Sequence, residues 1–255
     1  MIIDTHVHPP AQQGGRRALE RMVAIARRNG IDRLCLLGCV GEDGPDPSPP
    51  QVRDCNTETM AAVQASPDAF YGFCYLNPSH DPAFLRDEME RTLVAGPLRG
   101  IKLWVAVNCR DSRLDPILAR AGELGVPVLH HCWYKTVGLV YNESNPADIA
   151  HLAARFPRVQ IIMAHLTGCG CRGVADVRAY PNVYVDTSGS QPEHGIVEWA
   201  VAQLGAERVL FGSDAPGRDF SCQLGRVLGA DLSTRQRQLV LGGNACRLLR
   251  LEERP

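Results

Sequence analysis

Histidine and acidic residues recur in this 255-residue sequence at the ends of short apolar runs, a placement that suits metal binding. His6 and His8 end the first run and lie two residues apart, so a strand would direct both imidazoles to the same face. Two such imidazoles can reach one ion through bonds of roughly 2.0–2.1 Å. An isolated pair of this spacing is also typical of surface histidines, but the later runs end in matching polar residues. The pattern therefore predicts that His6 and His8 are metal ligands.

Two further ligands are expected at later runs. His130 and His131 are adjacent, so a strand would direct their side chains to opposite sides. His131 lies nearer the carboxyl end of its run and is the expected ligand, whereas His130 is expected to pack against helices. Asp214 adds a carboxylate after the last run. Three imidazoles and one carboxylate predict one divalent metal ion, with zinc favoured and manganese, iron or nickel left open, because ligand type does not fix the metal.

An acid or base is expected beside this ion. His165 follows the sixth run and is either a further ligand or, in the favoured interpretation, a catalytic acid/base. A metal lowers the pKa of its bound water towards 7, and Asp214 could take a proton from that water within hydrogen-bonding reach. The sequence thus predicts His165 and Asp214 as catalytic residues. Asp186 and Thr187 end the seventh run and Ser188 follows it, and these residues are expected to accept hydrogen bonds from metal-binding histidines.

Two cationic side chains are expected to bind substrate. Lys102, late in the fourth run, could bind a substrate carboxylate, pair with a carboxylate such as Asp186, or bridge two metals as a carbamate. The bridge is the least favoured of these, so one metal is expected rather than two. Arg218 lies four residues after Asp214 and could clamp an anionic substrate, although a surface arginine is nearly as good an interpretation.

Other reactive or aromatic residues give weaker signals. Cys169 and Cys171 could suit metal or redox chemistry, but no second cysteine pair lies nearby in the sequence, so a glycine-rich loop is the favoured interpretation. Trp104 and Trp133 follow the fourth and fifth runs and either wall a pocket or pack in the core.

These residues can meet only if the elements that carry them end at one face. Short apolar runs alternate with amphipathic stretches, which is typical of strands followed by helices. Eight such units in about 250 residues predict a single-domain α/β protein, a (β/α)8 barrel over residues 1–255 with its site at the carboxyl ends of the strands. An open doubly wound sheet is the alternative, but no glycine-rich phosphate motif follows the first run. The expected strands are residues 1–6, 31–37, 70–76, 98–104, 126–131, 158–164, 182–187 and 208–213, and the clearest helices are residues 16–30, 82–96, 146–157 and 192–205.

Three connecting segments are expected to be active-site loops. They are residues 41–51, 134–146 and 167–173, which follow the second, fifth and sixth strands. Loops after the strands of such a barrel lie on the face that carries the site.

Composition limits the partners. The formal net charge is −1, which gives no broad field to attract nucleic acid or an anionic membrane. The start of the sequence lacks the pattern of a secretory signal, and no apolar run approaches the roughly 18 residues that cross a bilayer. A cytoplasmic protein with ten cysteines as thiols is expected. The expected partner is a small substrate molecule and neither nucleic acid nor a membrane, and both an anionic substrate and a homo-oligomer are left open.

The sequence resembles the amidohydrolase superfamily, and within it the amidohydrolase-related branch that also contains metal-dependent decarboxylases. The residues that carry the resemblance are IIDTHVH, GIKLW, PVLHHCW, IIMAHLTG, YVDTSG, VLFGSDAP and GGNACRLL, in that order from residue 2 to about residue 249. The resemblance implies a (β/α)8 barrel. It also implies His6, His8, His131 and Asp214 as ligands, with His165 as the catalytic histidine of the sixth strand.

The resulting hypotheses about function fall into three classes. The leading one is hydrolysis of a small amide, ester or lactone by metal-activated water. The alternative is decarboxylation of a small carboxylic acid, in which His165 protonates the carbon that loses carbon dioxide. A non-catalytic metal-binding scaffold is a minor third, because the fold alone does not choose among them.

Overall fold

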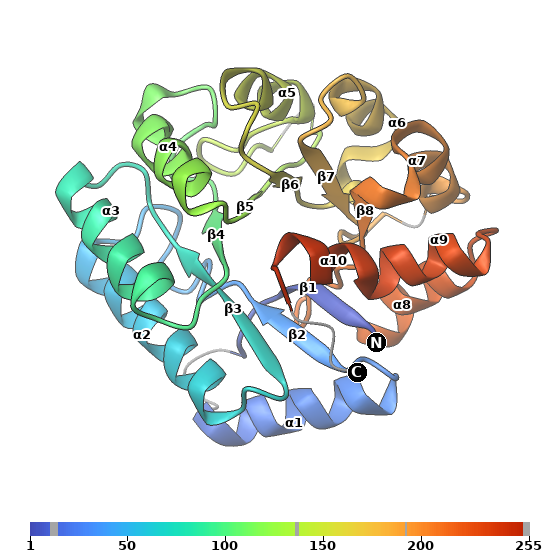
Figure 1. Cartoon of the computed structure of the whole chain (residues 1–255), viewed down its shortest axis with the longest axis horizontal. Coiled ribbons are helices and arrows are strands. Elements are labelled where there is room, and N and C mark those ends of the chain that lie inside the picture. Colours follow the sequence, from blue (N-terminus) through green and yellow to red (C-terminus); the bar gives the residue numbers. More distant parts are fainter. Residues whose placement is uncertain (11–14, 136–137, 192, 252–255) are drawn as a thin grey trace.

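Eight parallel strands follow one another in chain order around a central barrel (Figure 1). The computed structural model describes residues 1–10, 15–135, 138–191 and 193–251. The last strand returns to the first: Thr5 N donates to Phe211 O at 2.9 Å, Asp214 N donates to His6 O at 2.8 Å, and Val7 forms a parallel bridge with Ala215. The predicted barrel is confirmed. Its strands are β1 (Ile3–Val7), β2 (Arg33–Leu36), β3 (Phe70–Tyr75), β4 (Gly100–Leu103), β5 (Val128–His130), β6 (Ile161–Met163), β7 (Val183–Asp186) and β8 (Val209–Leu210).

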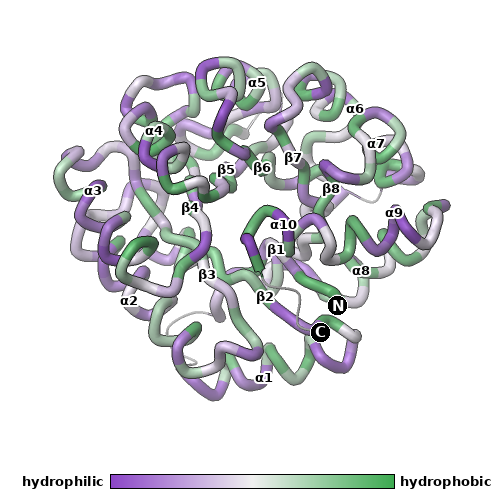
Figure 2. Tube along the Cα trace, viewed as in Figure 1, coloured by the Kyte–Doolittle hydropathy of each residue, from purple (hydrophilic) through white to green (hydrophobic). Residues whose placement is uncertain are grey.

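Helices surround the barrel and alternate with its strands (Figure 1). They are α1 (Gly15–Arg28), α2 (Pro49–Ala65), α3 (Pro82–Met89), α4 (Asp115–Leu124), α5 (Pro146–Arg155), α6 (Leu166–Val177), α7 (Ile196–Leu204), α8 (Phe220–Leu228), α9 (Thr234–Gln238) and α10 (Asn244–Leu248). Two π-helical turns, Glu90–Val94 and Leu239–Gly243, extend α3 and join α9 to α10. Hydrophobic and hydrophilic residues alternate along the helices, as a position between core and water requires (Figure 2). No helix among the described residues is long and apolar enough to span a membrane.

The expected loops differ partly from the structure. Residues 49–51 already belong to α2, which begins with proline at its first positions, where a missing N–H costs little. Residues 167–173 lie within α6 and not in a loop, so that expectation was wrong. The helix is interrupted at Thr167 and at Gly170, whose positive φ of 63° suits glycine. Of residues 134–146, Pro146 already begins α5, and the described residues 134–135 and 138–145 form a long connection after β5. Residues 136–137 lie outside the described part.

Apolar side chains fill the barrel up to the level where the strands end. Ile3, Phe73, Leu129 and Ile162 are among the buried residues of this inner cluster, and a larger cluster fills the space between strands and helices. Buried polar residues, among them His6, Lys102 and Asp186, lie closer to the carboxyl ends of β1, β4 and β7. The apolar layers thus form the floor on which the candidate site lies.

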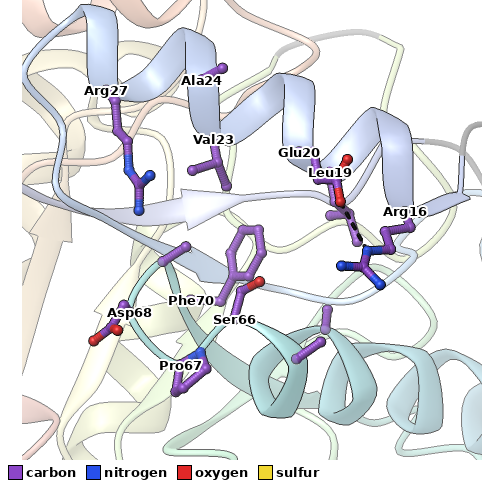
Figure 3. A pocket seen from close by; sticks show the side chains of 13 residues that line it. Arg16, Leu19, Glu20, Val23, Ala24, Arg27, Ser66, Pro67, Asp68 and Phe70 are labelled. Carbon is purple, nitrogen blue, oxygen red and sulfur yellow. Dashed lines mark hydrogen bonds and ion pairs between the residues drawn. The ribbon is translucent and has the colours of Figure 1, made fainter.

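A surface groove of about 500 Å³ lies between α1 and α2, outside the barrel. Figure 3 shows Leu19 and Val23 of α1 facing Phe70 across this groove. Phe70 is the first residue of β3, so the groove reaches the amino-terminal end of the barrel. None of the predicted site residues lines it.

Candidate metal centre

The carboxyl ends of β1 and β8 bring together three of the predicted ligands. Nε2 of His6 and Nε2 of His8 lie 3.7 Å and 3.6 Å from Oδ1 of Asp214. Two atoms that each bind one ion at roughly 2.1 Å can be no more than about 4.2 Å apart. Nε2 of His6 is also buried without a hydrogen-bond partner among the described residues. These three residues therefore fit a single transition-metal ion.

The tautomers of His6 and His8 support this fit. Nδ1 of His6 lies 2.8 Å from Oδ2 of Asp186, and Nδ1 of His8 lies 3.4 Å from the carbonyl oxygen of Gly38. A carboxylate oxygen and a carbonyl oxygen both accept hydrogen bonds, so each Nδ1 carries the proton. The Nε2 atoms that face Asp214 are then bare, which is the form that binds a metal.

Close backbone approach makes this arrangement feasible. Gly212 follows β8 between His6 and Asp186, and a Cβ at this position would lie only 2.9 Å from Cβ of His6 and 3.2 Å from Cβ of Asp186. Glycine at position 212 therefore allows β1 and β7 to bring their polar side chains together.

His165 stands beside this group at the start of α6. Its Nδ1 lies 2.9 Å from Oγ of Ser188, which in turn donates a short hydrogen bond to Asp186. Because the hydroxyl proton is used towards Asp186, Nδ1 of His165 is the donor to Oγ. Its Nε2 is then bare and faces Nδ1 of His131 at 3.1 Å. The expectation that Asp186 and Ser188 would support the histidines agrees with these contacts, whereas Thr187 donates to Gly212 O at 3.3 Å.

His131 is held differently from the other predicted ligands. Its Nε2 lies 2.7 Å from Oε1 of Glu143, a residue of the connection after β5 that no sequence pattern indicated. Among the described residues, His131 contacts His165 and belongs to neither group of ligand-type atoms that lie within 4.8 Å of one another. Those groups are His6, His8 and Asp214, and His6, His165 and Asp186. His131 as a fourth ligand stays a prediction.

His130 faces away from this cluster. It is buried, and its Nδ1 bonds to the carbonyl oxygen of His131 at 2.7 Å. The opposite directions of His130 and His131 follow the expected alternation along β5.

Burial keeps these imidazoles neutral. It lowers the pKa of His6 and of His165 well below the usual range, and it lowers the pKa of His8 to about 3, with the nearby charge of Lys102 acting in the same direction. Burial raises the pKa of Asp214 to about 6, although the charges of Lys102 and Arg218 oppose this shift. Neutral imidazoles beside a carboxylate are the donor set that a divalent cation requires.

Lys102 lies within this cluster with its side chain buried. Burial lowers its pKa to about 8, although Asp186 and Asp214 both act to raise it. Lys102 forms no hydrogen bond or ion pair with any residue in the described ranges, although the charge of Asp186 acts on it. Its roles as a substrate binder and as the partner of a carboxylate both stay predictions. An ammonium group next to Asp214 and without a protein partner remains available to an anionic ligand.

Arg218, Trp133 and the cysteines complete the surroundings. The charge of Arg218 acts on Asp214, and its buried Nε has no hydrogen-bond partner among the described residues. The ring of Trp133 lies 5.2 Å from that of His165, and a Cβ on Gly168 would approach the indole to 2.7 Å. Trp133 is therefore a wall of the site.

The two cysteines of the sequence motif lie apart. Cys169 is buried, with its Sγ 3.5 Å from Sγ of Cys132, whereas Cys171 is exposed, so the two cysteines of the motif do not share a site.

Comparison with known proteins identifies the family. The sequence profile described as amidohydrolase matches residues 3–251. A search of curated protein sequences gave no match. The chain is similar in structure to 5-carboxyvanillate decarboxylase from Sphingomonas paucimobilis, with a TM-score of 0.78 and 18% identity over 98% of this chain and 99% of the other.

Two further solved structures show the same likeness. One is a dihydroxybenzoic acid decarboxylase from a Polaromonas species with bound manganese and the inhibitor 2-nitroresorcinol, with a TM-score of 0.80 and 18% identity over 98% of this chain and 97% of the other. The other is a proposed 2-pyrone-4,6-dicarboxylic acid hydrolase from Pseudomonas putida, with a TM-score of 0.71 and 21% identity over 99% and 98%. With the profile covering nearly the whole chain, this protein belongs to the amidohydrolase 2 family of the amidohydrolase superfamily.

Proposed function

We propose that this chain is a metal-dependent decarboxylase of a small carboxylic acid. The observation that carries the proposal is the arrangement of three bare imidazole nitrogens: Nε2 of His6 and of His8 face Asp214, and Nε2 of His165 faces His131. Each is bare because the Nδ1 atom of the same ring donates to an oxygen. Solved structures similar to this chain include decarboxylases of aromatic acids, one with manganese bound. We therefore favour decarboxylation over hydrolysis, the reaction that the sequence alone favoured.

The residues that would hold the metal are His6, His8 and Asp214, with His131 as the fourth. A divalent ion bound there would supply positive charge to an anionic oxygen of the substrate or to a water molecule. Zinc and manganese both suit imidazole and carboxylate ligands, and the donor set does not choose between them.

The other residues of the site suit a carboxylate substrate. Lys102 offers an ammonium group without a protein partner, and Arg218 adds a second positive charge near Asp214. Trp133 offers a flat apolar wall beside His165, against which a planar acid would pack. Together these groups would bind the acid and exclude water from its reacting carbon.

The reaction needs one proton at the substrate carbon. When the bond to the carboxyl group breaks, its electron pair stays on that carbon and a proton replaces carbon dioxide. His165 would take up a proton from water at its bare Nε2 and pass it to this carbon, while its Nδ1–H is held by Ser188 and, through it, by Asp186. That hydrogen-bond chain would stabilise the imidazolium form between uptake and delivery of the proton.

Hydrolysis of a lactone or related ester is the second candidate. It is supported by the similarity to a proposed 2-pyrone-4,6-dicarboxylic acid hydrolase and by Asp214, whose pKa of about 6 suits a general base near neutral pH. In this reaction the product gains the elements of water and loses no carbon.

One experiment separates the two reactions. The metal-loaded protein is incubated in oxygen-18-labelled water with a panel of aromatic carboxylic acids and lactones, and carbon dioxide and product mass are measured. The proposal predicts release of carbon dioxide without incorporation of the label. Incorporation of the label without carbon dioxide would overturn it in favour of hydrolysis. A His165→Asn variant that still binds metal is expected to lose about 10²–10⁴-fold in kcat.

A further inference from the structure

Glu143 is a buried carboxylate at the edge of the candidate metal centre. It lies in the connection between β5 and α5 and is the sole acidic residue of residues 134–146. Its side chain is 1% exposed, although the surrounding residues 139–141 are exposed. A carboxylate withdrawn from water in this way needs partners that compensate for its lost hydration.

Those partners come from the site and from the same connection. Oε1 of Glu143 lies 2.7 Å from Nε2 of His131 and 3.0 Å from Nζ of Lys135, and Oε2 lies 2.9 Å from the same Nζ. The backbone N–H of Val140 donates to Oε2 at 3.3 Å. The ammonium group of Lys135 lies against both carboxylate oxygens of Glu143, and Oε2 also accepts from a backbone N–H. Both oxygens of Glu143 therefore act as acceptors.

An acceptor at Nε2 decides the tautomer of His131. The proton must lie on Nε2, so Nδ1 is bare and points at Nε2 of His165, 3.1 Å away. Nε2 of His165 is also bare, since Ser188 takes the proton of its other nitrogen. Two bare nitrogens at this distance repel each other unless positive charge lies against them.

We infer that Glu143 is a positioning residue of the metal centre, which fixes His131 in the tautomer that offers Nδ1 to the bound ion. This inference rests on the proposed metal-dependent function but concerns a different residue and a different measurement. Acceptors behind metal-binding histidines orient the ring and raise its basicity, and their loss costs about 10–100-fold in metal affinity.

The backbone around Glu143 is anchored well enough for this role. Asn142 donates through its N–H to Val105 O at 3.2 Å and through Nδ2 to Ala106 O at 2.8 Å. On the other side, Oγ of Ser144 accepts from Cys109 N at 3.0 Å. Both neighbours of Glu143 are thus tied to the connection after β4. A carboxylate held from both sides can fix the ring of His131 within a narrow range.

The test compares metal affinity in variants of similar size. Glu143→Gln keeps the shape but can either donate to or accept from Nε2, so it no longer selects a tautomer. Zinc affinity, measured by competition with a chromogenic chelator, is expected to fall about 10–100-fold, and the visible absorption spectrum of the cobalt-substituted protein is expected to change. Glu143→Asp keeps the charge and is expected to recover part of the affinity.

A matched control is available in Glu88. Its side chain is also buried and ion-paired, but with Arg53 and Arg91 between α2 and α3. Glu88→Gln is expected to lower the melting temperature and to leave zinc affinity and the cobalt spectrum unchanged. If Glu143→Gln also leaves both unchanged while remaining folded, the inference is overturned, and the proposed function is untouched.

A second measurement needs no metal. Nitrogen-15 spectra of the histidine rings report the tautomer of each imidazole in the metal-free protein. The wild type is expected to show His131 protonated on Nε2, and Glu143→Gln is expected to show a mixture. A wild type with His131 protonated on Nδ1 would overturn the inference even if the protein bound no metal at all.

Discussion

His165 and His131 face each other through Nε2 and Nδ1 at 3.1 Å, and each is held from behind by a different acidic group. Asp186 acts on His165 through Ser188, and Glu143 acts directly on His131. The same Asp186 also accepts from His6 at 2.8 Å. The outer carboxylates of the site therefore set which nitrogens turn inward.

Replacing Asp186 is expected to affect both metal binding and stability. Asp186→Asn can no longer accept every hydrogen bond that reaches the two carboxylate oxygens, from His6, Ser188 and the backbone N–H of His165. Metal affinity should fall about 10–100-fold. The free energy of unfolding of the metal-free protein should fall by about 1–3 kcal/mol, measured by urea denaturation. Unchanged values of both would show that Asp186 does not orient His6.

Asp214 is expected to make the stability of the metal-free protein depend on pH. Its pKa is raised by burial to about 6, above the ordinary value of 3.8, so the folded state holds the proton longer than the unfolded state. This contribution to stability is complete below about pH 4 and is lost as the pH rises through about 6.

The Asp214→Asn variant lacks this titration. Between pH 4 and pH 7 the wild type should therefore lose free energy of unfolding that the variant keeps. The difference, variant minus wild type, should rise over this range by at most about 3 kcal/mol. Chemical denaturation of both metal-free proteins at several pH values checks this. A difference that stays constant with pH would mean that Asp214 has an ordinary pKa.

Lys102→Met is expected to separate substrate binding from metal binding. The ammonium group has no partner in the described part of the chain and lies near Asp214, so its loss removes a repulsion towards a bound cation. Metal affinity should be kept or increased. KM for a carboxylate substrate, or Kd for a carboxylate inhibitor by calorimetry, should rise about 10–100-fold, as for loss of a charged hydrogen bond. Loss of bound metal in this variant would instead favour the role of a metal bridge.

The barrel and most of the site could be predicted because both depend on local patterns. Each strand is a short apolar run, and the polar residues that end β1, β7 and β8 meet because parallel strands share an end. The alternation of side chains along β5 likewise predicted that His131, and not His130, turns towards the site.

The parts that could not be predicted depend on contacts between distant segments. Glu143 lies 12 residues after His131 in a connection without periodicity, and its position depends on the anchoring of Asn142 and Ser144 to residues 105–109. The glycine-rich segment 167–173 resembles a loop in composition, but packing of α6 against α5 and α7 makes it largely helical. Tertiary contacts outweigh local propensity in both cases.

Metal content tests the central claim most directly. Inductively coupled plasma mass spectrometry is applied to the wild type and to His6→Ala/Asp214→Ala, after reconstitution with zinc or manganese and removal of free metal. We predict about one tightly bound transition metal per wild-type chain and its loss in a double variant that remains folded. A wild type that retains no metal after reconstitution, or a double variant that retains as much as the wild type, would contradict the assignment of this centre.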